Sequence, residues 1–308
     1  MATYKGTSNS DTFYDGTTGE DIYHGYGGND LFWSSPGSDT YYGGAGGGDR
    51  VSYTNSQSAV FVDLLAGSSY HPGQGARPED YFFDIEDVDG SYFNDRLYGN
   101  NADNELRGSL GQDRLYGRGG DDTLTADPTD LMIDGGTGRD TLVMFLNDAP
   151  GTVTLNDDGT GSFISNLRVV PLASIENVRV ESAYDVVCLG NSGSNNLTTG
   201  SGNDTLNGGD GDDYLRGLSG ADTFVFDHLG AGSQNQTDFV YDFEPGIDRI
   251  DLSGTSVQDF NDLFTPGDRY MEQLDDLGVV IHTSVSANTQ VLLVGVQMSD
   301  LTSADFVF

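Results

Sequence analysis

The chain has almost no cysteine, little positive charge and no long apolar run. Its single cysteine, Cys188, excludes an internal disulfide framework, and the apolar neighbours of Cys188 indicate a small buried hydrophobe. Lys5 is the only lysine and the formal net charge is −36, so no basic stripe exists to bind a nucleic-acid backbone. No apolar stretch is long enough to span a membrane, and the N-terminus lacks the charged-then-apolar form of a signal peptide.

Glycine and aspartate dominate what is present. The sequence has 44 Gly and 49 acidic residues, and aspartate, which far outnumbers glutamate, stands mostly beside glycine. A disordered acidic chain would not also carry 16 Phe and 16 Tyr in a regular pattern with branched aliphatics. The composition therefore predicts oxygen-rich loops that bind a hard cation.

A nine-residue repeat organises this composition. From Thr199 onward, aspartates recur every nine residues, and each is followed two positions later by Leu206, Leu215 or Phe224. The same frame holds Asn104, and Asp11 and Asp49 are each displaced from it by one residue. The aspartates that we predict as metal ligands are Asp21, Asp30, Asp39, Asp95, Asp113, Asp122, Asp140, Asp204, Asp213 and Asp222.

Each repeat contains a turn and a minimal strand. Six residues of the form Gly-Gly-x-Gly-x-Asp make a turn whose glycines permit positive φ and expose carbonyl oxygens. The next three residues form a strand whose middle side chain points inward. Two repeats complete one coil, and calcium between stacked turns would relieve the repulsion of their carboxylates. The glycines predicted to supply these turns are Gly117, Gly120, Gly200, Gly202, Gly208, Gly209, Gly211, Gly217 and Gly220.

More than ten such units in register resemble the RTX (repeats in toxin) family of secreted calcium-binding proteins. The resemblance implies an all-β fold, a right-handed parallel β-roll or β-helix with a β-rich C-terminal cap. We expect this roll over residues 1–222, with elaborated coils at 53–89 and 144–189. Residues 257–264 are predicted to form only one or two short helical turns.

Residues 223–308 resemble the C-terminal domain of serralysin metalloproteases and the modules that follow the catalytic part of mannuronan epimerases. This resemblance implies a cap that ends in an uncleaved signal for type I (ABC transporter) secretion, and thus an extracellular protein. The histidines His24, His71, His228 and His282 lack the His-Glu-x-x-His pairing of a metalloprotease, so no protease domain is expected.

Two features suggest contact with an acidic polysaccharide. The first is a set of outward side chains next to the repeat strands, in which rings could pack on sugars and guanidinium groups could pair with carboxylates. Cross-strand packing and relief of negative charge are the alternative explanation. The predicted substrate-binding residues are Trp33, Arg96, Tyr98, Arg114 and Tyr116.

The second feature is the loop 69–81, which has no repeat phase and contains Tyr70, His71 and Arg77. These three residue types suit a polyuronate lyase or C5-epimerase, although an ordinary surface insertion explains the loop as well. The epimerase motif Asp-Pro-His is missing, because Thr129 follows Asp127 and Pro128. The sequence thus predicts an extracellular calcium-binding matrix, adhesion or polysaccharide-binding module, with a calcium-dependent enzyme on acidic polysaccharide as the alternative.

Overall fold

The computed structural model describes residues 1–14, 18–72, 79–166, 168–227, 236–255, 257–264, 271–283 and 289–308. Arg77 and His228 lie outside these ranges. Apart from three short 3-10 helices, the regular structure in the described part is β-strand, which confirms the all-β prediction. The chain divides into two compact units, residues 1–143 with 170–175, and residues 144–169 with 176–308. Within the described ranges, no helix has the length and hydropathy needed to cross a membrane.

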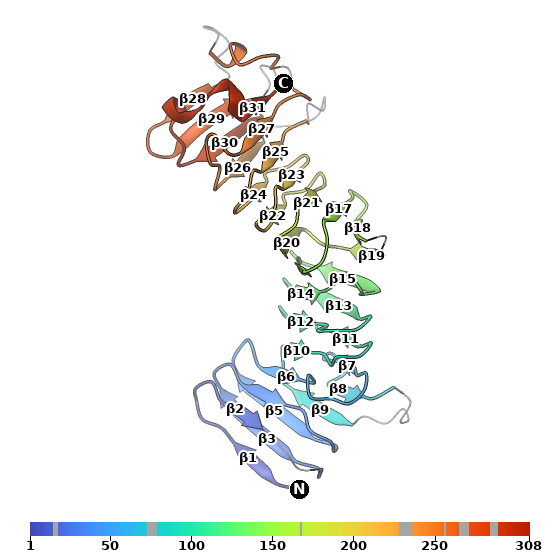
Figure 1. Ribbon diagram of the computed structural model, residues 1–308. Coiled ribbons are helices and arrows are strands. Elements are labelled where there is room, and N and C mark those ends of the chain that lie inside the picture. The colour runs from blue at the N-terminus through green and yellow to red at the C-terminus, as the bar shows by residue number, and fades with distance from the viewer. Residues whose placement is uncertain are drawn as a thin grey trace. The chain divides into compact units, whose positions relative to one another are not determined.

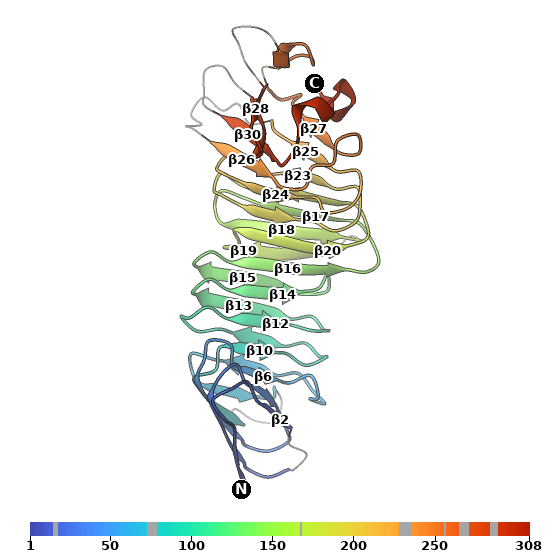
Figure 2. The ribbon, with the colours of Figure 1, turned by 90° about the vertical axis from the view of Figure 1, so that its left-hand side faces the viewer.

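The first unit is a parallel β-roll with two sheets, and successive coils add one strand to each (Figures 1 and 2). Its first sheet contains β1 (Thr3–Lys5), β3 (Ile22–Gly27), β5 (Thr40–Ala45), β7 (Phe61–Asp63), β8 (Ser68–Tyr70), β9 (Asp80–Phe83), β11 (Arg96–Tyr98), β13 (Arg114–Gly119) and β15 (Met132–Thr137). Its second sheet contains β2 (Thr12–Tyr14), β4 (Leu31–Trp33), β6 (Arg50–Ser52), β10 (Asp87–Asp89), β12 (Glu105–Arg107) and β14 (Thr123–Ala126). The strands β16 (Thr141–Leu146) and β19 (Arg168–Ala173) contain residues of both units.

The core follows from the middle residue of each short strand. On the first sheet, Leu97 pairs with Leu115 and Leu115 with Ile133, and all three are fully buried. On the second sheet, Leu106 pairs with Leu124 in the same way. Each coil therefore buries two large apolar side chains, which stack directly on those of its neighbours.

The elaborated coil predicted at 53–89 contains an antiparallel strand, whereas the sequence predicted a continuation of the parallel stack. Strand β8 runs antiparallel between β7 and β9, while β9 pairs with β5 and β7 pairs with β11. The first sheet thus has three strands between β5 and β11, whereas the second sheet has only β10 between β6 and β12. At about 4.8 Å per strand, the two extra strands lengthen one side of this unit by about 10 Å.

The second unit repeats this arrangement and then changes character. Strand β17 (Gly151–Leu155) forms an antiparallel hairpin with β18 (Thr160–Ser165) and pairs in parallel with β21 (Val186–Leu189). Its first sheet continues through β23 (Thr205–Asn207), β25 (Thr223–Val225), β27 (Arg249–Asp251) and β31 (Phe306–Val307). Its second sheet contains β20 (Asn177–Ser182), β22 (Asn196–Thr198), β24 (Tyr214–Arg216), β26 (Thr237–Val240) and β30 (Gln290–Val294).

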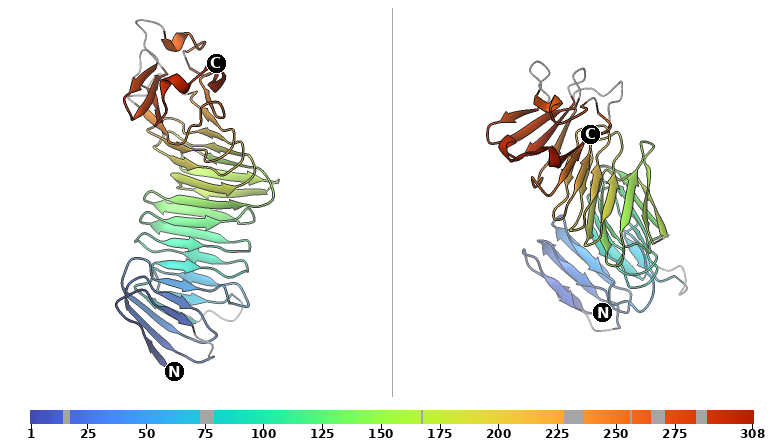
Figure 3. Two further views of the ribbon diagram at one scale, coloured as in Figure 1. Left: turned by 60° about the vertical axis from the view of Figure 1, so that its left-hand side comes forward. Right: turned by 45° about the horizontal axis from the view of Figure 1, so that its top comes forward.

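An antiparallel meander ends the second sheet of this unit. Strands β28 (Met271–Leu274) and β29 (Gly278–His282) extend the sheet beyond β30 (Figure 3). The predicted helical turns at 257–264 are represented by the 3-10 helix η1 (Asp262–Phe264), and two more such helices, η2 (Met298–Asp300) and η3 (Ser303–Asp305), precede β31. Val279, Ile281 and Val291 are fully buried, so the meander has an apolar core of its own.

Candidate metal centres

A ladder of aspartates connects the coils on the inside of the turns. The backbone N–H of Asp122 donates to Oδ1 of Asp140 at 2.8 Å, and that of Asp204 donates to Oδ1 of Asp222 at 2.8 Å. In regular coils the two partners are 18 residues apart, which is one full coil. All the predicted aspartates belong to this ladder as acceptors: Asp21, Asp30, Asp39, Asp95, Asp113, Asp122, Asp140, Asp204, Asp213 and Asp222.

The second carboxylate oxygen of several ladder aspartates is buried without a protein partner. Within the described ranges this holds for Oδ2 of Asp30, Asp49, Asp113, Asp122 and Asp213. Each of these residues is at most 1% exposed, so water does not satisfy the oxygen from outside. A buried carboxylate oxygen without a donor is costly unless a cation binds it.

Glycine five residues before the aspartate leaves room at this oxygen. A Cβ added to Gly117 would clash with Asp122 Oδ2 and with the carbonyl oxygen of Gly135 in the next coil. Gly208 stands in the same relation to Asp213, and Gly217 to Asp222. The glycine therefore keeps open a space that a carboxylate oxygen borders, and at Gly117 a carbonyl oxygen borders it too.

The remaining predicted glycines shape the turns. Gly120, Gly209, Gly211 and Gly220 have φ between +97° and +143°, a region that side chains disfavour. Gly200 and Gly202 pack directly on backbone atoms of Ser182 and Tyr184 in the preceding coil. These two glycines thus permit close stacking and do not border an aspartate oxygen.

Burial and mutual repulsion raise the pKa of the ladder carboxyls. Burial, together with the charges of Asp130 and Asp95, raises the pKa of Asp113 to about 9. Burial is also the main cause that raises the pKa of Asp122, Asp213 and Asp222 to about 7 each. These carboxylates need a positive charge beside them to remain ionised at neutral pH.

This chemistry fits calcium. Within the described part of the chain, no three His, Cys, Asp or Glu side chains converge on one point, so carbonyl oxygens must complete each site. Calcium accepts such mixed carboxylate and carbonyl sets, because it takes six to eight oxygen ligands in flexible geometry. Bound in these turns, the ion would neutralise the ladder and bridge neighbouring coils.

Some ladder members were not predicted from the nonapeptide frame. Asp80, Asp130, Asp238 and Asp248 accept the same backbone bond, from the N–H groups of Asp39, Asp113, Asp213 and Asp222. All four keep the Asp-x-apolar phrase of the repeat, with Phe82, Met132, Val240 and Ile250 as the apolar members. A search for Asp-x-apolar at any spacing would therefore have found these ladder aspartates.

Asp95 and Asp39 are exceptions among the predicted ligands. The Oδ1 of Asp95 accepts the N–H of Val60 at 2.7 Å, and its Oδ2 accepts the N–H of Ser91 at 2.5 Å and the hydroxyl of Ser91 at 3.0 Å. The Oδ1 of Asp39 accepts the N–H of Asp21 at 2.9 Å, and its Oδ2 accepts the hydroxyl of Ser35 at 2.9 Å. Protein donors therefore satisfy both oxygens of each of these two carboxylates.

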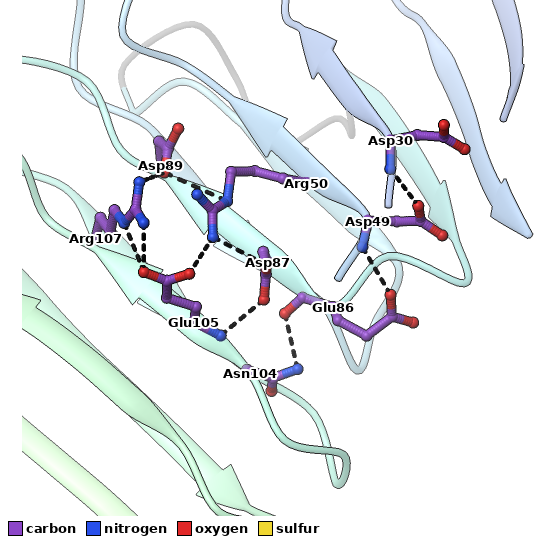
Figure 4. A network of polar contacts seen from close by, with 9 residues as sticks. All are labelled: Asp30, Asp49, Arg50, Glu86, Asp87, Asp89, Asn104, Glu105 and Arg107. Atoms are coloured by element: carbon purple, nitrogen blue, oxygen red, sulfur yellow. Dashed lines mark hydrogen bonds and ion pairs between the residues drawn. The ribbon is translucent and has the colours of Figure 1, made fainter. Parts of the chain in front are cut away.

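Two turns replace the cation with an amide. Asn104 stands at an aspartate position, and its Nδ2 donates to the carbonyl oxygen of Glu86 at 2.8 Å (Figure 4). Asn195 makes the equivalent bond to the carbonyl oxygen of Glu176 at 2.8 Å. Both glutamates belong to the Ile-Glu-x-Val phrase that closes each elaborated segment. We call these two turns the amide joints, the first at Asn104 and the second at Asn195. At each of them a side-chain N–H links neighbouring coils by a hydrogen bond, without a metal.

Ion pairs strengthen the first joint. Arg50 on β6 contacts Asp87 on β10 and Glu105 on β12, and its Nε lies 3.6 Å from Asp89 Oδ1 (Figure 4). Arg107, two residues after Glu105 on β12, contacts the same carboxylate. Figure 4 also shows the ladder reaching this joint, because the N–H of Asp49 donates to Glu86 Oε2 at 3.1 Å.

The structure brings four of the five predicted polysaccharide-binding residues together. Arg96 pairs with Arg114 and Tyr98 with Tyr116 on adjacent strands, and the two rings stack at 4.6 Å with an interplanar angle of 6°. Trp33 lies on the other sheet, where it stacks on Tyr14 at 5.6 Å, and does not join this group.

The loop candidates do not form one site. Tyr70 lies on β8 and stacks on Phe61 at 4.5 Å, in continuity with Tyr98. His71 contacts Ser56 and Glu79 instead, and Arg77 lies outside the described residues. Cys188 is fully buried, and burial raises the pKa of its thiol to about 12, in agreement with a structural role.

One family model matches the parts of the chain that contain the nonapeptide turns. The RTX calcium-binding nonapeptide repeat (four copies) matches residues 15–48, 89–124 and 189–224. No curated protein matches the chain. Among solved structures, the extracellular lipase LipA from Serratia marcescens is similar at 18% identity with a TM-score of 0.28, over 91% of this chain and 45% of that chain. The chain thus spans less than half the length of that lipase.

Proposed function

The chain is an RTX repeat protein whose nonapeptide turns bind calcium, and we propose that it works outside the cell as a module that holds acidic polysaccharide. Export through a type I apparatus suits its physics. In calcium-poor cytosol, the ladder carboxylates would repel one another and keep the chain unfolded and threadable. Outside the cell, calcium would bind only the stacked turns and drive folding by mass action.

The observation that carries the polysaccharide proposal is a pair of stacked arginines without carboxylate partners. Arg96 and Arg114 are cross-strand neighbours, and among the described residues no acidic side chain pairs with either. In a protein of net charge −36, two adjacent guanidinium groups without a protein carboxylate form a local positive surface that an external anion can bind.

Aromatic rings beside these arginines supply a sugar-binding surface. Along the first sheet, Tyr70 stacks on Phe61 at 4.5 Å, Phe61 contacts Tyr98 in a tilted arrangement at 5.2 Å, and Tyr98 stacks on Tyr116 at 4.6 Å. Arg118 lies 5.2 Å above the ring of Tyr98 and holds both oxygens of Asp63. The strip therefore presents ring edges and tyrosine hydroxyl groups with positive charge beside them, which suits the hydroxyl and carboxylate groups of a chain of uronate sugars.

The test is retention of the calcium-loaded protein on immobilised alginate, with dextran as the uncharged comparison. We expect retention on alginate that salt weakens, and its loss in the double variant Arg96→Gln/Arg114→Gln. Arg179→Gln is the matched control, because Arg179 already pairs with Glu181. Equal retention of wild type and double variant, or equal retention on dextran, would refute the proposal.

A further inference from the structure

A cavity of about 440 Å³ lies beside the first elaborated segment. Its walls are the serine-rich loop 34–38, the turn 55–58, and the side chains of His71 and Glu79. This volume is within the range of small-molecule sites. Neither the calcium ladder nor the aromatic strip accounts for it.

Three side chains at this cavity form a relay. Ser56 Oγ lies 3.0 Å from His71 Nε2, and His71 Nδ1 contacts Glu79 Oε2 on the other edge of the ring. The carboxylate holds the ring proton on Nδ1, which leaves Nε2 free to accept a proton from the serine. A serine, a base and a carboxylate that orients the base are the parts of an activated nucleophile.

The antiparallel hairpin β8–β9 brings the histidine and the glutamate together. Ser69 and Asp80 are paired across the hairpin, and the N–H of Glu79 donates to the carbonyl oxygen of Ser69 at 2.8 Å. This register places Glu79 opposite Tyr70, and His71, the next residue along the chain, contacts Glu79 just beyond the paired strands. Sequence reasoning singled out His71 but had no means to pair it with Glu79 or Ser56.

A buried tyrosine fixes the serine relative to the hairpin. The fully buried Tyr53 donates its hydroxyl to Asp80 Oδ2 at 2.7 Å, and its oxygen lies 2.9 Å from Ser69 Oγ. The carbonyl oxygen of Tyr53 accepts the N–H of Ser56 at 2.8 Å, which closes the turn that carries the serine. Rigid elements thus position all three members of the relay.

We propose that Ser56, His71 and Glu79 form a serine esterase site for short, uncharged acyl esters. Ser56 Oγ attacks the acyl carbon while His71 Nε2 takes the hydroxyl proton. His71 then returns that proton to the departing alcohol, which leaves an acyl-serine. Water, deprotonated by His71, hydrolyses the acyl-serine to a carboxylic acid and restores the serine hydroxyl.

The lining of the cavity selects this substrate class. Among the described residues that line the cavity, hydroxyl and amide groups surround Ser56, none is a lysine or arginine, and Glu79 adds negative charge. An anionic acyl group would be repelled, whereas a small neutral one can bind. The N–H of Gln57, which follows the serine and has no hydrogen-bond partner among the described residues, is placed to stabilise the oxyanion.

The serine proton has a competing acceptor. The carbonyl oxygen of Ser58 lies 2.8 Å from Ser56 Oγ, so the hydroxyl must rotate toward His71 before attack. A relay that only clasps the turn to the hairpin would leave the hydroxyl on Ser58 and show no reactivity. Covalent labelling separates these two roles.

The experiment uses the full chain in calcium with p-nitrophenyl acetate and a fluorophosphonate probe. We expect ester hydrolysis above the buffer rate and a probe adduct that peptide mass spectrometry locates on Ser56. His71→Ala should lower the rate by about 100-fold or more. Glu79→Gln, at a positioning residue, should lower kcat and leave KM unchanged. Ser299→Ala, at an exposed serine that contacts only Asp300, should keep the wild-type rate.

Two outcomes would overturn the proposal. One is wild-type protein that neither hydrolyses the ester above the buffer rate nor forms the adduct. The other is an adduct on another residue, together with an unchanged rate in Ser56→Ala. The adduct is mapped on wild-type protein, so a Ser56→Ala variant that fails to fold does not weaken the test. Polysaccharide retention is measured separately and can fail or succeed on its own.

Discussion

Acid should partly replace calcium in folding the roll. Asp213 is fully buried, and burial, with the charges of Asp212 and Asp210, raises its pKa to about 7 although its hydrogen bond from Asn195 acts against this. The same carboxyl in the unfolded chain has a pKa of about 3.9. A raised folded-state pKa means that the folded form binds the proton more tightly. The stabilisation is therefore complete below about pH 4 and is lost as the pH rises through about 7.

The size of the effect follows from these two values. Acidification from about pH 7.5 to about pH 5 adds about 2.5 kcal/mol to the free energy of unfolding for one such carboxyl. Asp122 and Asp222 have the same pKa of about 7, but neighbouring carboxyls interact, so their contributions do not simply add. After allowance for screening, we expect acidification to raise the free energy of unfolding of the metal-free chain by about 3 to 5 kcal/mol.

The assay is far-ultraviolet circular dichroism in EDTA, with urea midpoints measured at about pH 5 and about pH 7.5. Wild type should gain β signal and a higher urea midpoint in acid. Asp213→Asn, which cannot titrate, should gain about 2.5 kcal/mol less. Asp158→Asn is the control, because the pKa of this exposed carboxyl is lowered by its bonds from Thr160, and its removal should leave the acid gain unchanged.

Calcium should reverse the sign of the pH dependence. Protons compete with the metal for the same oxygens, so the calcium affinity must fall as the pH falls. The reasoning is refuted if the urea midpoint of the metal-free protein stays constant or falls on acidification. It is also refuted if Asp213→Asn gains as much as wild type.

Two further substitutions probe the turns directly. Gly117→Ala should raise the calcium concentration at the folding midpoint and lower the free energy of unfolding by about 1–3 kcal/mol, because the new methyl group fills the space beside Asp122 Oδ2. Gly47→Ala, whose Cβ would meet nothing within 4 Å, should change neither in the same titration. Asn104→Asp should cost about 1–3 kcal/mol in urea unfolding even at saturating calcium, because it removes the bond to the carbonyl oxygen of Glu86. Full recovery of that variant in calcium would contradict a metal-free joint.

The repeat made the roll predictable from sequence. A period of nine with one apolar residue per unit determines which residues stack, and the pairs Leu97 with Leu115 and Tyr98 with Tyr116 have the predicted register. The ladder aspartates were predictable for the same reason, because any residue in phase occupies an equivalent place in the next coil.

The elaborated segments were less predictable because their local pattern is ambiguous. The apolar run 59–65 reads as one strand, yet β7 ends at Asp63, whose Oδ1 accepts the N–H of Ala66 at 2.9 Å and starts the turn. The chain then reverses through Gly67, which has φ of +67°. Asp63 and Gly67 thus determine that the next strand runs antiparallel. Aspartate and glycine are also the residue types of the calcium turns, so the sequence alone does not distinguish the two kinds of turn.

Spacing explains why the serine relay was invisible in the sequence. Ser56 and His71 are 15 residues apart and His71 and Glu79 are 8 apart, with no fixed motif between them. Their meeting depends on the β8–β9 register and on the bonds of Tyr53, which exist only in the folded hairpin.

Because of the amide joints, some parts of the chain depend on calcium for their stability more than others do. In the turns with unpartnered Oδ2 atoms, the buried carboxylates of neighbouring coils repel one another unless a cation binds them. At Asn104 and Asn195, the contact between coils is a hydrogen bond within the protein, and at the first joint Arg50 adds ion pairs to it. Because β7, β8 and β9 lie next to that first joint in the stack, their geometry depends on protein contacts as well as on calcium. Loss of calcium should therefore unfold the repeat blocks before it disturbs the segment that carries Phe61, Tyr70 and the serine relay.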